Sequence, residues 1–548
     1  MRYLPQRDRA RGASLRHKDA PIAGLSLAGE RLGEPVRFRR GRARRCGSVG
    51  DIVIEKSQRL IVIDVDGLRR DVFRTSLAAG DLPNVARIVG GREERSACHV
   101  DALSTAPSIT FAAQASIFTG QHPGRHGIAG NESFDRLGRI SSGHPRHFGF
   151  DVGYTLAVDD AVRVFSAGLA SQLLSSETPT LYEIASANDM TSAVAYNMYA
   201  RGADAWLPPD IVEIARFTKG KRVLGLEAGQ YDSGMLDRLI AHLDAGNRPD
   251  LLTAYFMGLD HHSHAHGPAS QPAYLRDVVD PQIGRLLDAL EMRGMLAGAL
   301  FALVSDHGQI EVVPDDHHSI RLGFPFDREL GHLFAALGLD VHDLPGEDPA
   351  CDAVMGLNGG LAHVYLQHRA ARWANPPRYA DDVLPVAEAF HQMNKSGKYE
   401  ESLRGSLDLI LVRDAEREGW QGEYRIYLGG GQTQPFGDYL AAHPELGYAD
   451  PANRIRLAAS ALTGDLILAA NGRAGYYFGA PTTGVHGGLL PAESEAVLTF
   501  AYPGGSSQEI ARLRETVAGI VADRCAAEGN REPSVADMVP AALALLGM

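Results

Sequence analysis

The sequence predicts an α/β fold with a mostly parallel central sheet, flanking helices and an inserted cap subdomain. Three observations support this prediction. Short apolar runs typical of buried strands recur along the chain, helical patterns lie between them, and the alternation loosens after about residue 311. Strands that alternate with helices indicate βαβ units, because a parallel neighbour is reached only through a crossover connection.

Three predicted strands define the centre of this sheet. They cover residues 60–63, 251–257 and 299–304, which are short and predominantly apolar. Each run is followed by a carboxylate, and these carboxylates are Asp66, Asp260 and Asp306. Because ligands of α/β sheets bind beyond the carboxyl ends of the strands, we expect the three acids at one site.

The remaining core elements are predicted from hydrophobic periodicity. The predicted strands are residues 191–196 and 496–502, and the predicted helices are residues 231–243, 274–293 and about 507–526. A last helix is expected from about Ser534, because the spacing to Asp537 suits an N-cap.

Residues 311–481 are predicted to form the cap. Gly-, Pro- and Asp-rich loops separate strand-like pieces there, including residues 361–366 and 407–412. Residues 466–470 and 476–478 are expected to pair as a hairpin around an Asn-Gly turn. The predicted organisation is a basic, disordered segment at 1–56, a first part of the catalytic core at 57–310, the cap at 311–481 and a second part of the core at 482–548.

Charge is distributed unevenly along the chain, whose formal net charge is −13. Residues 1–50 hold 13 Lys and Arg against 4 Asp and Glu and show no helix or strand periodicity. A dispensable tail, a targeting segment, a nucleic-acid or membrane-surface arm, and upstream sequence from a mistaken start all fit this segment. The acidic remainder argues against nucleic-acid binding through a broad basic face and suits bound cations.

The sequence shows no membrane or secretory segment. No stretch approaches the roughly 18 apolar residues of a membrane span, and the basic segment at residues 1–50 lacks the apolar region of a signal peptide. We therefore expect a cytoplasmic protein. The four cysteines lie far apart, which indicates neither a disulfide framework nor a thiolate zinc site.

Seven residues together match the needs of a two-metal hydrolase, which uses carboxylates, imidazoles and an activated hydroxyl. They are Asp66, Thr110, Asp260, His264, Asp306, His307 and His486. Asp260 and His264 are four residues apart and would share one face of a helix. Each residue alone is also compatible with an ordinary turn, loop or cap, so the prediction depends on the combination.

Thr110 stands at the start of a predicted helix within residues 104–120. A hydroxyl at a helix N-terminus gains from the positive end of the helix dipole, which favours its alkoxide and a bound phosphate. Alone, such a threonine is usually an N-cap. A metal ion would supply the missing activation, so the set predicts a hydrolase with phosphoryl chemistry as the first candidate.

The chain resembles the alkaline phosphatase superfamily and, within it, the type I phosphodiesterase/nucleotide pyrophosphatase group. The matching segments occur in the family order and span roughly residues 57–548. They are residues 63–69, 110–120, 123–128, 260–264 with Gly267, 305–308 and 486–488.

This resemblance implies hydrolysis of phosphodiester or pyrophosphate bonds of a small-molecule phosphoester. It implies two divalent metals, with zinc as first choice and manganese or iron as alternatives. One metal would be held by Asp260, His264 and His486, and the other by Asp66, Asp306, His307 and Thr110. Thr110 would attack phosphorus to give a phosphothreonine, which a water on the first metal would hydrolyse.

The residues behind Thr110 depart from the family pattern. Family nucleotide pyrophosphatases commonly place Pro-Asn-His after the Thr-Phe pair, and the asparagine helps to hold a phosphate oxygen. Here residues 112–114 are Ala-Ala-Gln. Either Gln114 makes this substrate contact, or the metals and backbone amides hold the oxygen alone.

Two other functions stay open at this stage. A phosphomonoesterase or phosphonate hydrolase could use the same scaffold, although the lack of a clear arginine clamp favours diesters. A non-catalytic metal-binding protein is the alternative of another class. No oligomeric state is predicted.

Overall fold

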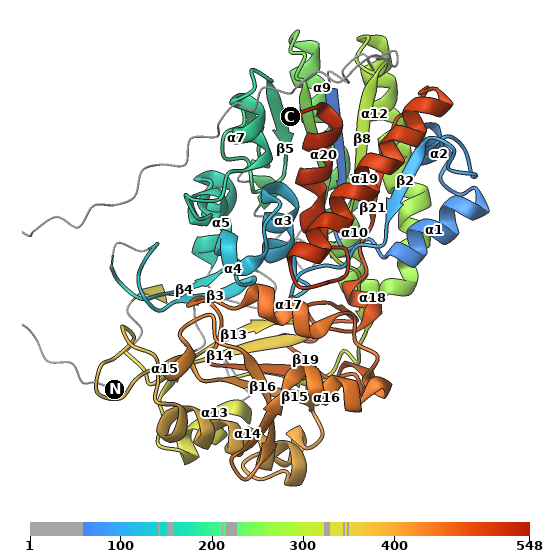
Figure 1. Cartoon of the computed structure of the whole chain (residues 1–548). Coiled ribbons are helices and arrows are strands. Elements are labelled where there is room, and N and C mark those ends of the chain that lie inside the picture. Colours follow the sequence, from blue (N-terminus) through green and yellow to red (C-terminus); the bar gives the residue numbers. More distant parts are fainter. Residues whose placement is uncertain are drawn as a thin grey trace, which may run out of the picture. The chain divides into compact units, whose positions relative to one another are not determined.

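A seven-stranded sheet forms the core of the computed structural model (Figure 1). The structure describes residues 59–140, 143–150, 158–210, 212–214, 227–322, 329–342, 346–347 and 350–548. The strand order is β2-β21-β8-β1-β7-β5-β6. The strands are β1 (Arg59–Val65), β2 (Ala97–Val100), β5 (Ser192–Ala195), β6 (Ala205–Leu207), β7 (Leu251–Phe256), β8 (Ala299–Val304) and β21 (Leu498–Ala501). Neighbours from β6 to β8 are parallel, whereas β21 and β2 add antiparallel strands at one edge. This confirms the predicted α/β fold with a mostly parallel sheet. The predicted basic segment lies outside the described residues.

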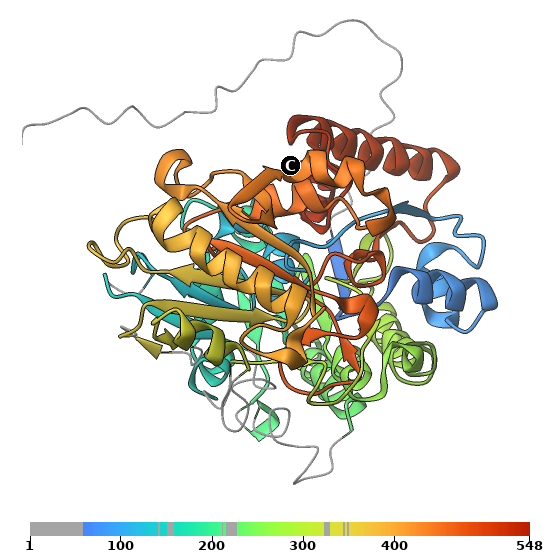
Figure 2. The ribbon, with the colours of Figure 1, turned by 90° about the horizontal axis from the view of Figure 1, so that it is seen from below.

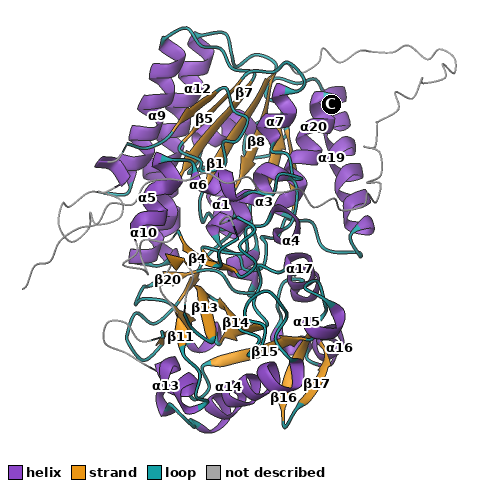
Figure 3. Cartoon of the chain, turned by 90° about the vertical axis from the view of Figure 1, so that its left-hand side faces the viewer, coloured by secondary structure: helices purple, strands orange, loops and turns teal. Residues whose placement is uncertain are grey.

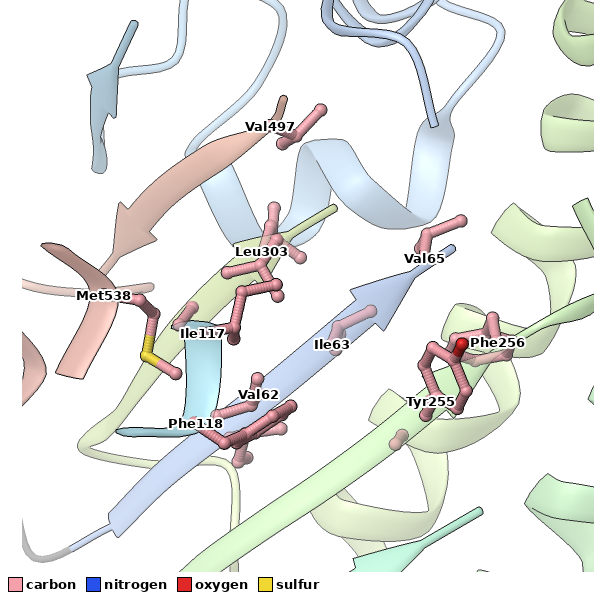
Figure 4. Close-up of a cluster of buried hydrophobic side chains, with 14 of the residues drawn as sticks. Val62, Ile63, Val65, Ile117, Phe118, Tyr255, Phe256, Leu303, Val497 and Met538 are labelled. Atoms are coloured by element: carbon pink, nitrogen blue, oxygen red, sulfur yellow. The ribbon is translucent and has the colours of Figure 1, made fainter. Parts of the chain in front are cut away.

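The centre of the sheet is buried on both faces, as parallel sheets require. Figure 4 shows part of this buried cluster, with Val62 and Ile63 of β1, Leu303 of β8 and Phe118 of helix α3. In β1, Asp64 pairs with Tyr255 of β7 and with Val304 of β8, so the three strands end at nearly the same level. The segments that follow them therefore lie side by side at one edge of the sheet.

Helices cover both faces of this sheet. Figure 3 shows it between a layer that contains α9 and α12 and a layer that contains α19 and α20. The helices of this part are α1 (Arg70–Ala79), α2 (Pro83–Val89), α3 (Thr110–Thr119), α4 (Pro123–His126), α5 (Val158–Ser166), α6 (Leu169–Leu173), α7 (Leu181–Ser186), α9 (Gly229–Asp244), α10 (Gly258–His266), α11 (Gln271–Tyr274), α12 (Asp280–Met292), α18 (Pro491–Ser494), α19 (Ser507–Ala527) and α20 (Met538–Leu546). The predicted helices correspond to α9, to α11 and α12 joined by a π-helical turn, and to α19. The predicted helix N-cap at Ser534 also forms, as a capping box with Asp537.

A second seven-stranded sheet occupies residues 341–470, in the order β11-β13-β14-β18-β15-β16-β17. Its strands are β11 (Val341–His342), β13 (Ala353–Asn358), β14 (Leu361–Leu366), β15 (Leu407–Arg413), β16 (Tyr424–Gly429), β17 (Gln432–Pro435) and β18 (Leu466–Ala470). The associated helices are α13 (Glu329–Ala336), α14 (Leu384–Ser396), α15 (Ala415–Glu418), α16 (Phe436–Ala442) and α17 (Pro451–Ala458). Figure 2 shows α14 across the face of this sheet.

Strand β18 explains why this second sheet is covered on both faces. Leu466 and Leu468 join the cluster that contains Phe390 of α14, whereas Ile467 joins the cluster of Phe436 and Ile455 on α16 and α17. Side chains alternate between the two faces of a strand, so one apolar strand serves both clusters.

The predicted hairpin between residues 466–470 and 476–478 is wrong. Strand β18 pairs with β14 and β15, and β19 (Tyr477–Phe478) pairs in parallel with β10 (Ser319–Ile320). The side chain of Asn471 accepts a hydrogen bond from the amide of Ala474 and caps a short 3-10 turn. This local capping replaces the two-residue hairpin turn that Asn-Gly favours.

Short strands complete the described structure. β12 (Gly346–Glu347), β4 (Arg146–Gly149) and β3 (Glu132–Asp135) form a small antiparallel sheet, and β9 (Ile310–Glu311) pairs with β20 (Gly484–Val485). Within the described residues, no helix combines the length and apolar character needed to span a membrane.

Candidate metal centre and catalytic pocket

Thr110 is the first residue of α3, and the extended backbone of Ile109 precedes it. The loop that leads to it is held from outside: Ser108 Oγ donates to Gly488 O at 2.9 Å. The Thr110 hydroxyl lies 3.1 Å from His307 Nε2. The predicted nucleophile is therefore at a helix N-terminus and next to a predicted metal ligand.

Asp66, Asp306 and His307 form one group of potential ligands, because β1 and β8 are adjacent parallel strands. His307 Nε2 lies 3.5 Å from Asp66 Oδ1 and 3.3 Å from Asp306 Oδ2. These two carboxylate oxygens are buried and have no hydrogen-bond partner among the described residues. The opposite oxygens are fixed by the Tyr255 hydroxyl on Asp66 and by the amide of Gly67 on Asp306. The unpartnered oxygens are thus held ready for a cation.

Asp260, His264 and His486 form the second group. Asp260 and His264 lie one turn apart on α10, and His264 Nε2 is 3.1 Å from Asp260 Oδ2. Pairing of β20 with β9 brings His486 to them, with its Nε2 3.7 Å from Asp260 Oδ1. The His486 ring also stacks on His307 at a centroid distance of 3.6 Å. The two groups are therefore direct neighbours.

The three imidazoles are oriented for metal binding. Each Nδ1 faces a backbone carbonyl, at 2.7 Å for His264, 3.1 Å for His486 and 3.0 Å for His307. A carbonyl only accepts, so each ring donates from Nδ1 and turns Nε2 toward the carboxylates, where its lone pair is available to a metal once the ring is neutral. The Nε2 atoms of His264 and His486 are 3.2 Å apart. A shared divalent cation would satisfy both lone pairs.

Burial and charge support this arrangement. Burial and the neighbouring His307 hold the pKa of His486 well below its usual range. Burial, followed by the charges of Asp306 and Asp260, raises the pKa of Asp66. At Asp260 burial acts in the same direction, but the imidazoles, His264 first, bring the pKa below its usual range. Divalent cations would offset the repulsion among the three acids, so the donor set fits metal ions.

Glycines allow the backbone to pass close to these ligands. Gly67 has φ +67°, and a Cβ on it would lie 2.6 Å from Asp260 Oδ1. Gly487 has φ +108°, and a Cβ there would lie 1.9 Å from Asn358 O. Any larger residue at either position would displace a turn that carries a ligand.

A cavity of about 460 Å³ opens on the two groups and Thr110. Its wall away from the ligands is largely apolar, and Phe111 and Phe150 stack there with a centroid distance of 4.7 Å. None of the described residues that line it is Arg or Lys.

Asn131 is a site residue that the sequence reasoning missed. It is buried, lines the same cavity as Thr110, and accepts a hydrogen bond from the Phe111 amide through Oδ1 at 3.0 Å. Its amide nitrogen keeps two N–H donors that this bond does not use. The matched segment 123–128 ends only three residues earlier, which was the available signal.

The structure contradicts the predicted substrate contact of Gln114. Its side chain is fully buried and does not line the cavity. Gln114 donates to Asp64 Oδ1 at 3.3 Å and accepts from Asn197 Nδ2 at 2.8 Å. One helical turn after Thr110, the side chain points toward β1 instead of the substrate side.

The type I phosphodiesterase/nucleotide pyrophosphatase family model matches residues 60–409 of the chain. This protein belongs to that family. No curated protein sequence matches the chain. Among solved structures, murine ectonucleotide pyrophosphatase/phosphodiesterase 5 is similar, with 14% identity, a TM-score of 0.51 and coverage of 89% of this chain and 95% of the murine chain. The human counterpart gives 12% identity, a TM-score of 0.50 and coverage of 89% and 95%.

These similarities confirm the family and the alkaline phosphatase-like fold. The chain is accordingly a hydrolase of phosphoric esters. An inactive variant of the murine protein, 14% identical to this chain with a TM-score of 0.51, has been solved in complex with AMP.

Proposed function

We propose that the chain cleaves phosphodiester or pyrophosphate bonds with two divalent metals and Thr110 as nucleophile. The observation that carries the proposal is the arrangement of both ligand groups around one hydroxyl. Thr110 lies 3.1 Å from His307, which stacks on His486 of the other group.

The residues present fit two metal ions. Asp260, His264 and His486 would hold one, and Asp66, Asp306, His307 and Thr110 the other. When bound, the metals would lower the pKa of the Thr110 hydroxyl and neutralise charge on the phosphoryl oxygens. Mixed carboxylate and imidazole ligands suit zinc, and manganese and iron accept the same donors.

The residues of the chain divide the chemistry between them. The Thr110 oxygen attacks phosphorus while the bond to the leaving oxygen breaks, which gives a phosphothreonine. The N-terminus of α3 directs its positive dipole end toward this phosphoryl group. The amide nitrogen of Asn131 donates to a phosphoryl oxygen. Water then cleaves the phosphothreonine and restores the hydroxyl.

The cavity favours diesters over monoesters. A monoester carries one more negative charge, and no described lining residue is a cation that would bind it. The apolar wall at Phe111 and Phe150 suits a weakly polar or aromatic substituent on the phosphate.

The test is an assay of the purified protein on aryl phosphodiesters, phosphomonoesters and phosphonates, with bound metal measured in parallel. We expect bound transition metal and a preference for diesters. Thr110→Ala and Asp306→Ala should lose turnover, while Thr110→Ser, which keeps the hydroxyl, should retain part of it. Full activity of either alanine variant, or absence of bound metal from an active enzyme, would contradict the proposal.

A further inference from the structure

Gln309 is a fully buried side chain that connects the two groups of potential metal ligands. It stands two residues after His307 and directly before β9. Its side chain nevertheless reaches the other group, because Gln309 Nε2 donates to Asp260 Oδ1 at 2.7 Å. The same nitrogen lies 3.5 Å from the backbone carbonyl oxygen of Asp260. A segment that carries ligands of one group therefore holds a ligand of the other.

The Gln309 contact completes a pattern that all three acidic ligands share. On each acid, one carboxylate oxygen accepts a hydrogen bond, and the other oxygen lies within 3.5 Å of an imidazole nitrogen. The donors are the Tyr255 hydroxyl on Asp66, the Gly67 amide on Asp306 and the Gln309 side-chain amide on Asp260. Asp260 Oδ2, which Gln309 leaves open, is 3.1 Å from His264 Nε2. The hydrogen bond from Gln309 thus fixes the rotation of the Asp260 carboxylate toward the imidazoles.

Packing alone does not explain a glutamine at this position. Gln309 is 0% exposed, and its Oε1 has no hydrogen-bond partner among the described residues. A buried carbonyl oxygen without a partner destabilises the folded state, because it has lost its hydration. A methionine of similar length would fill this space without that penalty, but it would offer no N–H group to Asp260.

A neutral donor also suits the charge that a cation site needs. The amide of Gln309 orients the Asp260 carboxylate without neutralising it, so the full negative charge stays available to a metal ion. A lysine or arginine in the same place would form an ion pair with Asp260 and compete with the cation.

We propose that Gln309 is a positioning residue for the metal that Asp260, His264 and His486 would hold. This role rests on the proposed function, which assigns that metal site. Groups that donate to a metal-binding carboxylate fix its orientation, and their loss typically weakens metal binding about 10- to 100-fold. Without Gln309, the carboxylate of Asp260 would be free to rotate away from the two imidazoles.

Separate zinc affinities for the two groups test this role without an assay of turnover. Asp66→Ala removes a ligand of one group, so only the Asp260 group remains complete. His264→Ala removes a ligand of the Asp260 group, so only the other group remains complete. In each background, a chromophoric chelator of known affinity withdraws zinc from the loaded full-length protein, and the competition gives the zinc Kd.

Gln309→Met fills the same space and removes the N–H donors. Its matched control is Gln392→Met, because Gln392 also donates to a carboxylate, that of Glu388 on α14, outside both groups. In the Asp66→Ala background, Gln309→Met should weaken zinc binding about 10- to 100-fold, and Gln392→Met should leave the Kd unchanged. In the His264→Ala background, Gln309→Met should bind zinc as its parent does, which also shows that this variant folds.

The possible failures are distinct. Equal zinc affinity of Gln309→Met and Gln392→Met at the Asp260 group, or the same loss at both groups, overturns the role of Gln309 and leaves the proposed function standing. A wild-type protein that binds no zinc, manganese or iron contradicts the proposed function and removes this role with it.

Discussion

Arg454 of α17 bonds the loop of residues 104–109, which leads to the proposed nucleophile Thr110. Its replacement gives the sharpest prediction about how the site is held. This buried side chain on α17 donates to five acceptors: Ser104 O, Thr105 O, Ala449 O, Gly488 O and Ser494 Oγ. Burial lowers the pKa of Arg454 to about 10, so the guanidinium is charged at neutral pH.

Arg454→Met keeps an apolar stem of similar length and removes all five hydrogen bonds. Gly488 O retains a bond from Ser108, whereas the carbonyls of Ser104, Thr105 and Ala449 each lose the side-chain donor. At about 1 kcal/mol or more for each buried unpaired acceptor, the free energy of unfolding should fall by about 3 kcal/mol. Because residues 104–109 lead directly to Thr110, a shift of the loop by about 1 Å would also lower kcat about 100-fold.

The assay combines denaturant unfolding, bound metal and kcat for Arg454→Met with the same measurements for Arg456→Met. Arg456 lies on the same helix, is exposed, and bonds Asn453 and Glu528 at the surface. Arg456→Met should lower the free energy of unfolding by less than about 0.5 kcal/mol. If the two variants match each other in stability and kcat, the loop does not depend on Arg454 and the reasoning fails.

Three further results are expected. Burial lowers the pKa of His126 to about 3 from its usual 6.5, so only the unfolded chain takes up this proton as the pH falls below 6.5, and the free energy of unfolding decreases in that range. In denaturant unfolding, His126→Gln should reduce the slope of the unfolding free energy against pH by up to about 1.4 kcal/mol per pH unit. An unchanged slope would contradict this prediction. Asn131→Asp keeps the acceptor for the Phe111 amide but replaces the N–H donors by a negative charge. The value of kcat/KM should therefore fall about 100-fold with little change in the free energy of unfolding. Wild-type kinetics would exclude Asn131 from phosphate binding. Removal of metal by a chelator should lower the unfolding temperature, and added zinc at about 100 times its Kd should restore about 2.7 kcal/mol; equal melting of the treated and loaded protein would count against resident metals.

The parts of the fold that follow from local pattern were predictable. Residues 60–63, 251–257 and 299–304 are apolar enough to be buried strands, and their parallel register aligns the acids that follow. Asp260 and His264 converge because helical geometry alone places residues four apart on one face.

Features that depend on non-local packing were not predictable. Gln114 was expected near the phosphate from its distance to Thr110 in the sequence. Its side-chain amide instead donates to Asp64 and accepts from Asn197 inside the core. The predicted hairpin at Asn471 does not form because β18 pairs with β14 and β15, which come from distant parts of the sequence. Asn131 reaches the site through the path of the chain after α4, and the neighbouring segment 123–128 was the one local signal for it.

Acid quenching during turnover tests the central claim most directly. The metal-loaded enzyme is mixed with an aryl phosphodiester, quenched, digested and analysed by mass spectrometry for the peptide that contains Thr110. We expect one added phosphoryl group, with its organic substituent, on Thr110, and no such adduct in Thr110→Ala. An active enzyme with no adduct at any quench time, or with the adduct on another residue, would contradict it.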